Sequence, residues 1–370
     1  MSDSCAARWV ELRACSIILS SDAASGSVAL SEVRTVDPGS RLRQWLAPGV
    51  GWVELGSDWD SLAAHLRKQP PVFCRHICPV QARVPLKHDA TDLDHLAEVC
   101  SRFIPYLSVT ETFSVQTRLF ANSARDYHYG EAELAKVGSG WPYARYDVNT
   151  RLSERLIGQG IPLDVRKPEQ ILSVVLAADE GYLGVSHAVD NVSDWAGGER
   201  RFKREEGQVS RAEFKLLEAM EAFDLSLPAG GAALDLGAAP GGWTRILRKH
   251  GMSVVAVDPA ALDARITSDP AVRHMRETAQ SYLLKAHETF DVILSDMRMD
   301  AQIAARIILM AGRNLQEGGW ALLTLKLPKR GMARVVASAL EVMREGYEVL
   351  GARQLFHNRS EVTVALRKLT

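Results

Sequence analysis

The stretch Leu234–Trp243, LDLGAAPGGW, constrains the fold of this chain more than any other part of the sequence. It joins a short strand that we expect to be buried, Ala232–Leu236, to a helical pattern that is closed by Gly251. Glycines at such a strand–helix junction allow a tight turn and let a ligand approach the backbone closely. Ligands of α/β sheets bind at the carboxyl ends of the strands, so we expect a ligand at this turn. The spacing differs from the G-x-G-x-x-G of a dinucleotide loop.

A second apolar run after this loop ends in an acid. Val254–Val257 is followed directly by Asp258. A carboxylate at the end of such a strand can accept hydrogen bonds from two ribose hydroxyls of an adenosine. The plainer alternative is that Asp258 caps a helix. Taken together, the loop and the acid favour a ligand that contains adenosine.

Strand-like and helical patterns alternate through residues 210–370, which we expect to form one domain. The alternation predicts an α/β fold: a Rossmann-like, doubly wound and mostly parallel sheet with helices on both faces. The last two strand-like runs, Tyr347–Leu355 and Glu361–Leu366, are close in sequence, so we expect an antiparallel pair at the sheet edge. Ser210, with Glu213 three residues later, is typical of a helix N-cap with a capping box.

The first 209 residues show an α+β pattern instead, in which Leu163–Val165 is one of the expected strands. We predict a subdomain over residues 1–70, a second domain over residues 71–190 and a polar linker over residues 191–209. The linker contains a basic cluster, which is either a solvated connector or a strap that contacts phosphates. The cluster consists of Arg200, Arg201, Lys203 and Arg204.

Composition limits the classes of function. The net charge of −1 gives no overall attraction to nucleic acid, so any such affinity must come from local patches. No apolar run approaches the roughly 18 residues of a membrane span, and the N-terminus lacks the pattern of a secretory signal. Five cysteines, an odd number, argue against a disulfide framework and favour the cytoplasm. Cys74 and Cys78 flank His76, but no second ligand pair follows, so we favour buried thiols over a metal site.

The loop and four further motifs resemble those of FtsJ-type RNA ribose 2′-O-methyltransferases. The loop D-L-G-A-A-P-G-G-W is similar to that family's cofactor loop, and Ser210–Leu216, SRAEFKL, is similar to its S-R-A-x-F-K-L helix. Ser295-Asp296, Leu325–Leu327 and Arg359–Val362 follow in the family's order. The strings LKLPKR and RQLFHNRSEVTV resemble the RlmM-type branch, bacterial enzymes that methylate a cytidine ribose in 23S rRNA. These enzymes carry an N-terminal THUMP-like domain, which we expect over residues 71–190.

The resemblance implies S-adenosylmethionine as the methyl donor and a catalytic tetrad of Lys215, Asp296, Lys326 and Glu361. Thr278 stands where the family often has an acid near the adenine, so adenine contacts are expected from Glu277 or Thr278 or from backbone amides. Trp243 is expected either beside the cofactor loop or in the core. The full set of expected cofactor residues is Asp235, Gly237, Ala238, Pro240, Gly241, Gly242, Trp243, Asp258, Glu277, Thr278 and Asp296.

The chemistry of the tetrad agrees with this assignment. A ribose 2′-hydroxyl is a poor nucleophile, and a lysine can deprotonate it only if its amine is neutral. Burial and a second ammonium both lower the pKa of a lysine, and two lysines among two carboxylates titrate as a group. We therefore expect Lys326 to be the base, Asp296 to orient it and face the methyl group, and Lys215 and Glu361 to tune the charge and position the ribose.

Each tetrad residue alone has a plainer explanation. Asp296 could cap a helix, Lys326 could be an edge lysine and Lys215 could lie on a helix surface. Glu361 could pair with Arg359 or Arg367. The combination of all four in family order with the loop favours the functional explanation.

The expected RNA contacts are basic residues close to the tetrad in sequence, although a solvated face explains them equally well. The leading hypothesis is methylation of a ribose 2′-hydroxyl in large-subunit rRNA, with a cytidine of 23S rRNA as the expected target before the subunit is fully assembled. The alternatives are an rRNA-binding assembly factor with a vestigial methylase domain and a small-molecule O-methyltransferase. The expected RNA contacts are Arg211, Lys329, Arg330 and Arg359, with Arg334 and Arg353 nearby.

Overall fold

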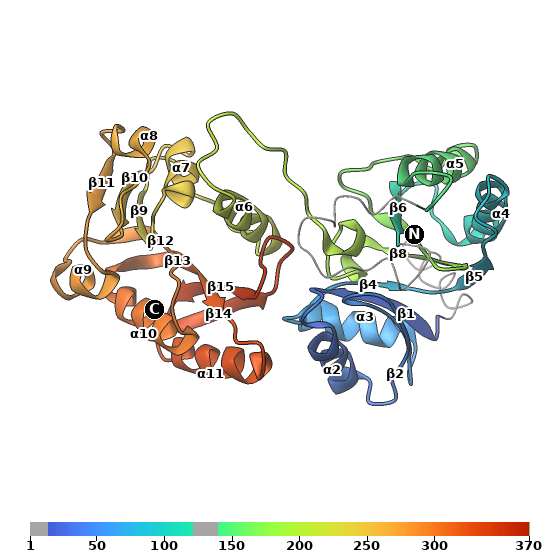
Figure 1. The fold of residues 1–370 in the computed structure, drawn as a ribbon, viewed down its shortest axis with the longest axis horizontal. Helices are drawn as coiled ribbons and strands as arrows, with labels where there is room; N and C mark the ends of the chain where they lie inside the picture. The colour runs from blue at the N-terminus through green and yellow to red at the C-terminus, as the bar shows by residue number, and fades with distance from the viewer. Residues whose placement is uncertain (1–13, 121–139, 370) are drawn as a thin grey trace. The chain divides into compact units, whose positions relative to one another are not determined.

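The structure is a computed structural model that describes residues 14–120 and 140–369. The chain forms two compact units, Met1–Glu199 and Arg200–Thr370 (Figure 1). The boundary falls inside the segment 191–209 for which we predicted a linker. The first part of that segment packs with the N-terminal unit, since Asn191 O accepts a hydrogen bond from Ile77 N. Within the described ranges no helix is long and apolar enough to cross a bilayer.

The N-terminal unit contains two four-stranded sheets. The first has the order β2-β3-β1-β4 and is antiparallel in every pair. The second has the order β5-β8-β7-β6, in which only β6 and β7 run parallel. The strands are β1 (Ser16–Ser21), β2 (Arg41–Ala47), β3 (Val50–Glu54), β4 (Cys74–Pro79), β5 (Ala82–Pro85), β6 (Phe113–Leu119), β7 (Gln170–Ala177) and β8 (Glu180–His187).

Helices complete both halves of this unit, as expected for an α+β pattern. The apolar faces of α4 and α5 bury Leu96, Leu152 and Leu156 in one core with the second sheet. Leu163–Val165 is not a strand, and the prediction was wrong. Leu163 forms only an isolated bridge to Phe113 and stays exposed. The helices are α2 (Gly26–Val36), α3 (Trp59–Lys68), α4 (Thr91–Cys100), η1 (Ser101–Tyr106), α5 (Arg145–Ile157), η4 (Ala188–Asp190) and η5 (Ala196–Gly198).

The C-terminal unit is built on one seven-stranded sheet of order β11-β10-β9-β12-β13-β15-β14. The first five strands are parallel, whereas β15 runs antiparallel to both β13 and β14. The α/β prediction is therefore confirmed. The predicted edge pair forms, but β15 lies inside the sheet and only β14 is at the edge. The strands are β9 (Ala232–Leu236), β10 (Ser253–Val257), β11 (Val272–Met275), β12 (Phe290–Ser295), β13 (Leu315–Lys326), β14 (Tyr347–Arg353) and β15 (Glu361–Lys368).

Helices cover both faces of this sheet because its central strands are apolar and buried on both sides. Helix α6 contacts α7, and α10 contacts both α9 and α11. Figure 1 shows these two groups on opposite faces of the sheet. The helices are α6 (Ala212–Ala222), α7 (Gly242–Lys249), α8 (Ala264–Thr267), α9 (Ala279–Lys285), α10 (Ala301–Ala311), η6 (Gly312–Asn314) and α11 (Met332–Arg344).

The start of α6 differs from the prediction. Arg211, not Ser210, is the N-cap, and its side chain makes no capping hydrogen bond. Half of the expected capping box is present, because Glu213 Oε1 accepts hydrogen bonds from Val209 N (2.7 Å) and Ser210 N (3.3 Å). Buried Glu213 therefore fixes the backbone that enters α6.

The strand order reverses between β9 and β12, because the chain runs outward from β9 to β11 and then returns to the other side of β9. In open α/β sheets the ligand crevice lies at such a switch point, beyond the carboxyl ends of the strands. The predicted functional residues can therefore be sought where β9 and β12 end.

Candidate active site

The glycine-rich loop between β9 and α7 takes a conformation that few other residues could adopt. Gly237 has φ +78° and Gly241, at the start of α7, has φ +112°. A Cβ atom on Gly237 would lie 2.6 Å from Met297 Cγ, and one on Gly242 would lie 2.3 Å from Ser210 Oγ. The glycines thus let the loop pass close to two neighbouring segments.

Asp258 braces the loop from the end of β10. Its Oδ2 accepts a hydrogen bond from Ala239 N (3.1 Å) and its Oδ1 accepts one from Ala260 N (2.8 Å). The alternative that Asp258 caps a helix is wrong, because Asp263 caps the next helix, α8. A carboxylate held beside the loop suits the predicted hydrogen bonds to a ribose.

Two predicted cofactor residues have packing roles in the structure, and their contact with a cofactor stays a prediction. The carboxylate of Asp235 is buried and accepts a hydrogen bond from Thr244 Oγ1 at 2.6 Å, which ties β9 to α7. Burial, with smaller contributions from the carboxylates of Asp296 and Asp258, raises the pKa of Asp235 to about 7. Trp243 is buried and its Nε1 donates to Ala212 O at 2.7 Å, so the core-packing alternative is the one seen.

The raised pKa of Asp235 predicts a dependence of stability on pH. The native state binds this proton more tightly than the unfolded chain does, so the stabilisation is complete below about pH 4 and is lost as pH rises to about 7. Asp235→Asn cannot ionise and can still accept from Thr244. We expect the variant to be more stable than the wild type at about pH 8, by up to about 4 kcal/mol, with little gain near pH 4.

Denaturant unfolding at the two pH values measures this difference. Asp224→Asn, a change at an exposed aspartate of the same unit, is the matched control. An Asp235→Asn variant no more stable than the wild type at the higher pH would show that ionisation of the buried Asp235 carboxyl does not destabilise the fold.

The four predicted tetrad side chains meet at the end of the parallel strands. Lys215 lies on α6, Asp296 follows β12 directly, Lys326 ends β13 and Glu361 begins β15. Lys326 and Glu361 are direct partners in the antiparallel register of β13 and β15, which places their side chains together. Asp296 N donates to Leu236 O (3.2 Å), so the cluster adjoins the glycine-rich loop.

The tetrad forms a closed ring of ion pairs. Lys326 Nζ lies 2.6 Å from Asp296 Oδ1 and 2.8 Å from Glu361 Oε1. Lys215 Nζ lies 2.6 Å from Glu361 Oε2 and 3.2 Å from Asp296 Oδ2. The plainer explanations for these residues fail. Asp300, not Asp296, caps α10, and Glu361 pairs with the two lysines while Arg367 pairs with Glu348.

The opposite charges of this ring stabilise one another's ionised forms. Burial would lower the pKa of Lys215, but the carboxylates of Asp296 and Glu361 outweigh it and raise that pKa. Burial would raise the pKa of Asp296, but Lys326 and Lys215 outweigh it and lower that pKa. The expectation that burial lowers the lysine pKa is therefore wrong at Lys215, which is held as an ammonium beside an ionised Asp296.

Thr324 joins the ring and was missed by the sequence analysis. Its hydroxyl donates to Asp296 Oδ1 at 2.6 Å and accepts from Lys326 Nζ at 2.9 Å. The sequence could have indicated this contact, because Thr324 lies two residues before Lys326 on a predicted strand, and such residues share a face. With Thr324, Lys326 Nζ has three hydrogen-bond partners, as many as an ammonium can serve.

The other predicted residues lie around this site. After β11, Glu277 accepts from Ser281 Oγ and pairs with Lys285, while Thr278 caps α9 through Ser281 N. Their contact with an adenine stays a prediction. The predicted RNA contacts are all exposed and flank tetrad elements: Arg211 before α6, Lys329 and Arg330 after β13, and Arg359 before β15.

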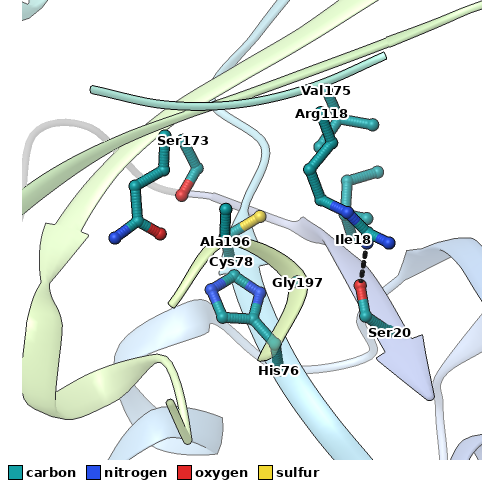
Figure 2. A pocket seen from close by; sticks show the side chains of 10 residues that line it. Ile18, Ser20, His76, Cys78, Arg118, Ser173, Val175, Ala196 and Gly197 are labelled. Atoms are coloured by element: carbon teal, nitrogen blue, oxygen red, sulfur yellow. Dashed lines mark hydrogen bonds between the residues drawn. The ribbon is translucent and has the colours of Figure 1, made fainter. Parts of the chain in front are cut away.

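Residues Cys74–Cys78 are buried in the N-terminal unit. His76 and Cys78 line a small pocket with Arg118, as Figure 2 shows. Burial, with the charge of Arg118, lowers the pKa of His76 to about 3, and burial raises the pKa of Cys78 to about 11. A guanidinium in the same pocket repels a metal cation, so the buried-thiol interpretation fits these residues better. Among the described residues, no group of three or more histidine, cysteine, aspartate or glutamate side chains is arranged to hold a metal ion.

Comparison with known proteins adds independent information. Residues 208–351 match the family model of FtsJ-like methyltransferases. Three proteins named Ribosomal RNA large subunit methyltransferase M are similar to the chain. The protein of Azotobacter vinelandii is 35% identical over 219 residues, which cover 56% of this chain and 60% of that protein. The protein of Alkalilimnicola ehrlichii is 36% identical over 46% of this chain and 49% of that protein. The protein of Aeromonas hydrophila is 28% identical over 82% of each.

These matches confirm the predicted resemblance for the C-terminal unit and, as a property of that domain's family, its methyl donor S-adenosylmethionine. The matches to the first two relatives span only about half to three-fifths of their length.

Proposed function

We propose that this chain, whose residues 208–351 form an FtsJ-like methyltransferase domain, transfers a methyl group from S-adenosylmethionine to a ribose 2′-hydroxyl of RNA. The observation that carries the proposal is the ring of Lys215, Asp296, Lys326 and Glu361 beside the glycine-rich loop. Two lysines and two carboxylates held within hydrogen-bond distance can orient a hydroxyl and take up its proton.

The donor's sulfonium supplies an electrophilic methyl group when it is bound. Gly237–Gly242 would hold it through backbone contacts, and Asp258 would accept hydrogen bonds from its ribose. The loop follows the carboxyl end of β9 and Asp258 follows that of β10, and α/β sheets bind their ligands at such strand ends.

Lys326 is our candidate for the group that takes the proton of the 2′-hydroxyl. For this step its amine must be neutral, with two N–H groups left to donate to two of its three partners and one lone pair directed at the hydroxyl. Lys215 then remains the single cation of the ring, because Asp296 and Glu361 hold its proton. The four side chains would carry a net charge of −1 in that state, which suits a site that must also accept a positive sulfonium.

The proposed substrate is large-subunit rRNA, with a cytidine of 23S rRNA as the target. The support is the name of the three relatives, Ribosomal RNA large subunit methyltransferase M. The N-terminal unit, as a THUMP-like domain, would bind the RNA. The enzyme would act in the cytoplasm before subunit assembly hides the ribose. An assembly factor without catalysis is less favoured, because every tetrad side chain is in place.

Mass-spectrometric mapping of 2′-O-methyl nucleotides in rRNA tests this function. We expect one modified nucleotide to disappear from cells that lack this gene and to return when the wild-type gene is restored. Identical maps from the two kinds of cell would contradict an rRNA target. Methyl transfer to a metabolite but not to RNA would favour a small-molecule methyltransferase instead.

A further inference from the structure

Four aromatic side chains gather on the C-terminal unit, and we call them the aromatic cluster: Phe202, Phe214, Phe356 and His357. The rings of Phe202 and Phe214 are stacked, with centroids 5.8 Å apart and planes inclined by 14°. The ring of His357 lies 5.7 Å from Phe202, 5.2 Å from Phe214 and 5.1 Å from Phe356. All four residues are partly exposed. The proposed methyl transfer gives these rings no role.

The aromatic cluster is attached to the elements that carry the tetrad. Phe214 precedes Lys215 on α6, and His357 lies in the turn that leads into Glu361. Buried Glu218 fixes this turn to α6, because its two carboxylate oxygens accept from Phe356 N and His357 N, each at 2.8 Å. The rings of Phe214, Phe356 and His357 are therefore held on the elements that carry Lys215 and Glu361.

Two guanidinium groups lie over rings of the aromatic cluster. The guanidinium of Arg200 lies 4.1 Å from the Phe202 centroid, and that of Arg201 lies 5.7 Å from the Phe356 centroid. Arg200 also forms a two-point ion pair with Glu221 on α6, with distances of 2.6 and 2.8 Å. Exposed basic side chains flank the rings in sequence, namely Lys203 beside Phe202, Arg211 before Phe214 and Arg359 after His357.

We propose that the aromatic cluster stacks an unpaired base of the RNA whose ribose enters the tetrad. The inference rests on the proposed function and narrows its substrate class to single-stranded RNA. Unpaired bases stack on aromatic rings and on guanidinium planes, whereas the faces of bases in a duplex are already covered. The flanking basic side chains suit the phosphates on either side of the stacked base.

A purely structural role for the cluster makes a different prediction. Phe202 belongs to the segment 200–209, which other contacts also hold on the unit. Lys249 pairs with Glu205, and Arg245 donates to Glu206 O at 3.1 Å. If Phe202 only anchors this segment, leucine at position 202 should preserve RNA binding. Loss of the Lys249–Glu205 ion pair should then weaken RNA binding about as much as loss of the Phe202 side chain does. Stacking requires a flat ring.

The test measures the affinity of the full-length protein for short fluorescent oligocytidylates by anisotropy at one salt concentration. We expect Phe202→Ala and Phe202→Leu each to weaken binding of the single strand about tenfold, and Phe202→Trp to retain it. Lys249→Ala should stay close to the wild type. Hybridising the RNA to its complement should weaken wild-type binding and remove most of the difference between the variants.

Binding of S-adenosylmethionine, measured for each variant, shows whether the C-terminal unit is still folded. Wild-type affinity in Phe202→Leu, or equal losses in Phe202→Leu and Lys249→Ala, would overturn the stacking role. So would a preference for the duplex. The proposed function is tested separately, because a wild type that methylates no rRNA would refute the reaction whatever this binding series shows.

Discussion

Lys326→Ala is expected to reduce the rate of methyl transfer to RNA by about 10²- to 10⁴-fold, the usual contribution of a positioned acid or base. Lys326 Nζ is the only tetrad atom that contacts Asp296, Glu361 and Thr324 together in the described structure. Its loss removes the proposed proton acceptor and leaves Asp296 with Lys215 as its remaining ammonium partner. Because Lys326 ends β13 whereas the glycine-rich loop follows β9, binding of the donor should change much less.

Transfer of radiolabelled methyl groups to rRNA lacking the modification measures the rate, and calorimetric titration with S-adenosylmethionine measures donor binding. Lys249→Ala is the control, since it removes a lysine of the same unit that lies outside the ring. A Lys326→Ala enzyme with near-normal turnover would show that Lys326 is not the proton acceptor. A variant that binds no donor would show that Lys326 also supports the cofactor site.

The parts of the fold that could be predicted are those with strong local patterns. Ala232–Leu236 is short, apolar except for Asp235, and followed by a glycine-rich loop, and it forms β9 with the same bounds. By contrast, β11 has the sequence VRHM and is only partly buried at one edge of the sheet. It contains no apolar run from which a strand could be predicted. Leu163 and Val165 were misjudged for the opposite reason. Their alternation is typical of a strand, but both side chains are exposed in a loop.

The site shows the same division between local and long-range information. Glycines in the loop and an acid after β10 are local features, and both lie where expected. That Lys326 meets Glu361 depends on the register between β13 and β15, which no local pattern gives, so only the family resemblance could bring them together beforehand. The pKa of Lys215 depends on the competition between burial and two carboxylates, and its direction needs their distances.

Gly237→Ala should weaken binding of S-adenosylmethionine at least about tenfold, equivalent to about 1.4 kcal/mol. Alanine at φ +78° is strained by roughly 1–2 kcal/mol, and its Cβ would lie 2.6 Å from Met297 Cγ and 3.2 Å from Met297 N. The backbone of Met297 must then shift, or the loop must move out of the space proposed for the donor. Met297 follows Asp296, so we expect the same change to disturb the tetrad and lower the turnover rate as well.

Gly230→Ala separates these two causes. Gly230 has φ +71°, a strain close to that of Gly237, but a Cβ there would meet no described atom within 4 Å. Both variants should lose similar stability from the backbone conformation, while only Gly237→Ala should lose donor affinity in calorimetric titration. Equal donor affinity in the two variants would mean that the close approach of Gly237 to Met297 is unimportant for binding. A loss of donor affinity in Gly237→Ala alone would show that the donor binds next to the segment that carries Asp296. The proposed reaction requires this, because the methyl group of the donor must lie beside the ribose that the tetrad holds.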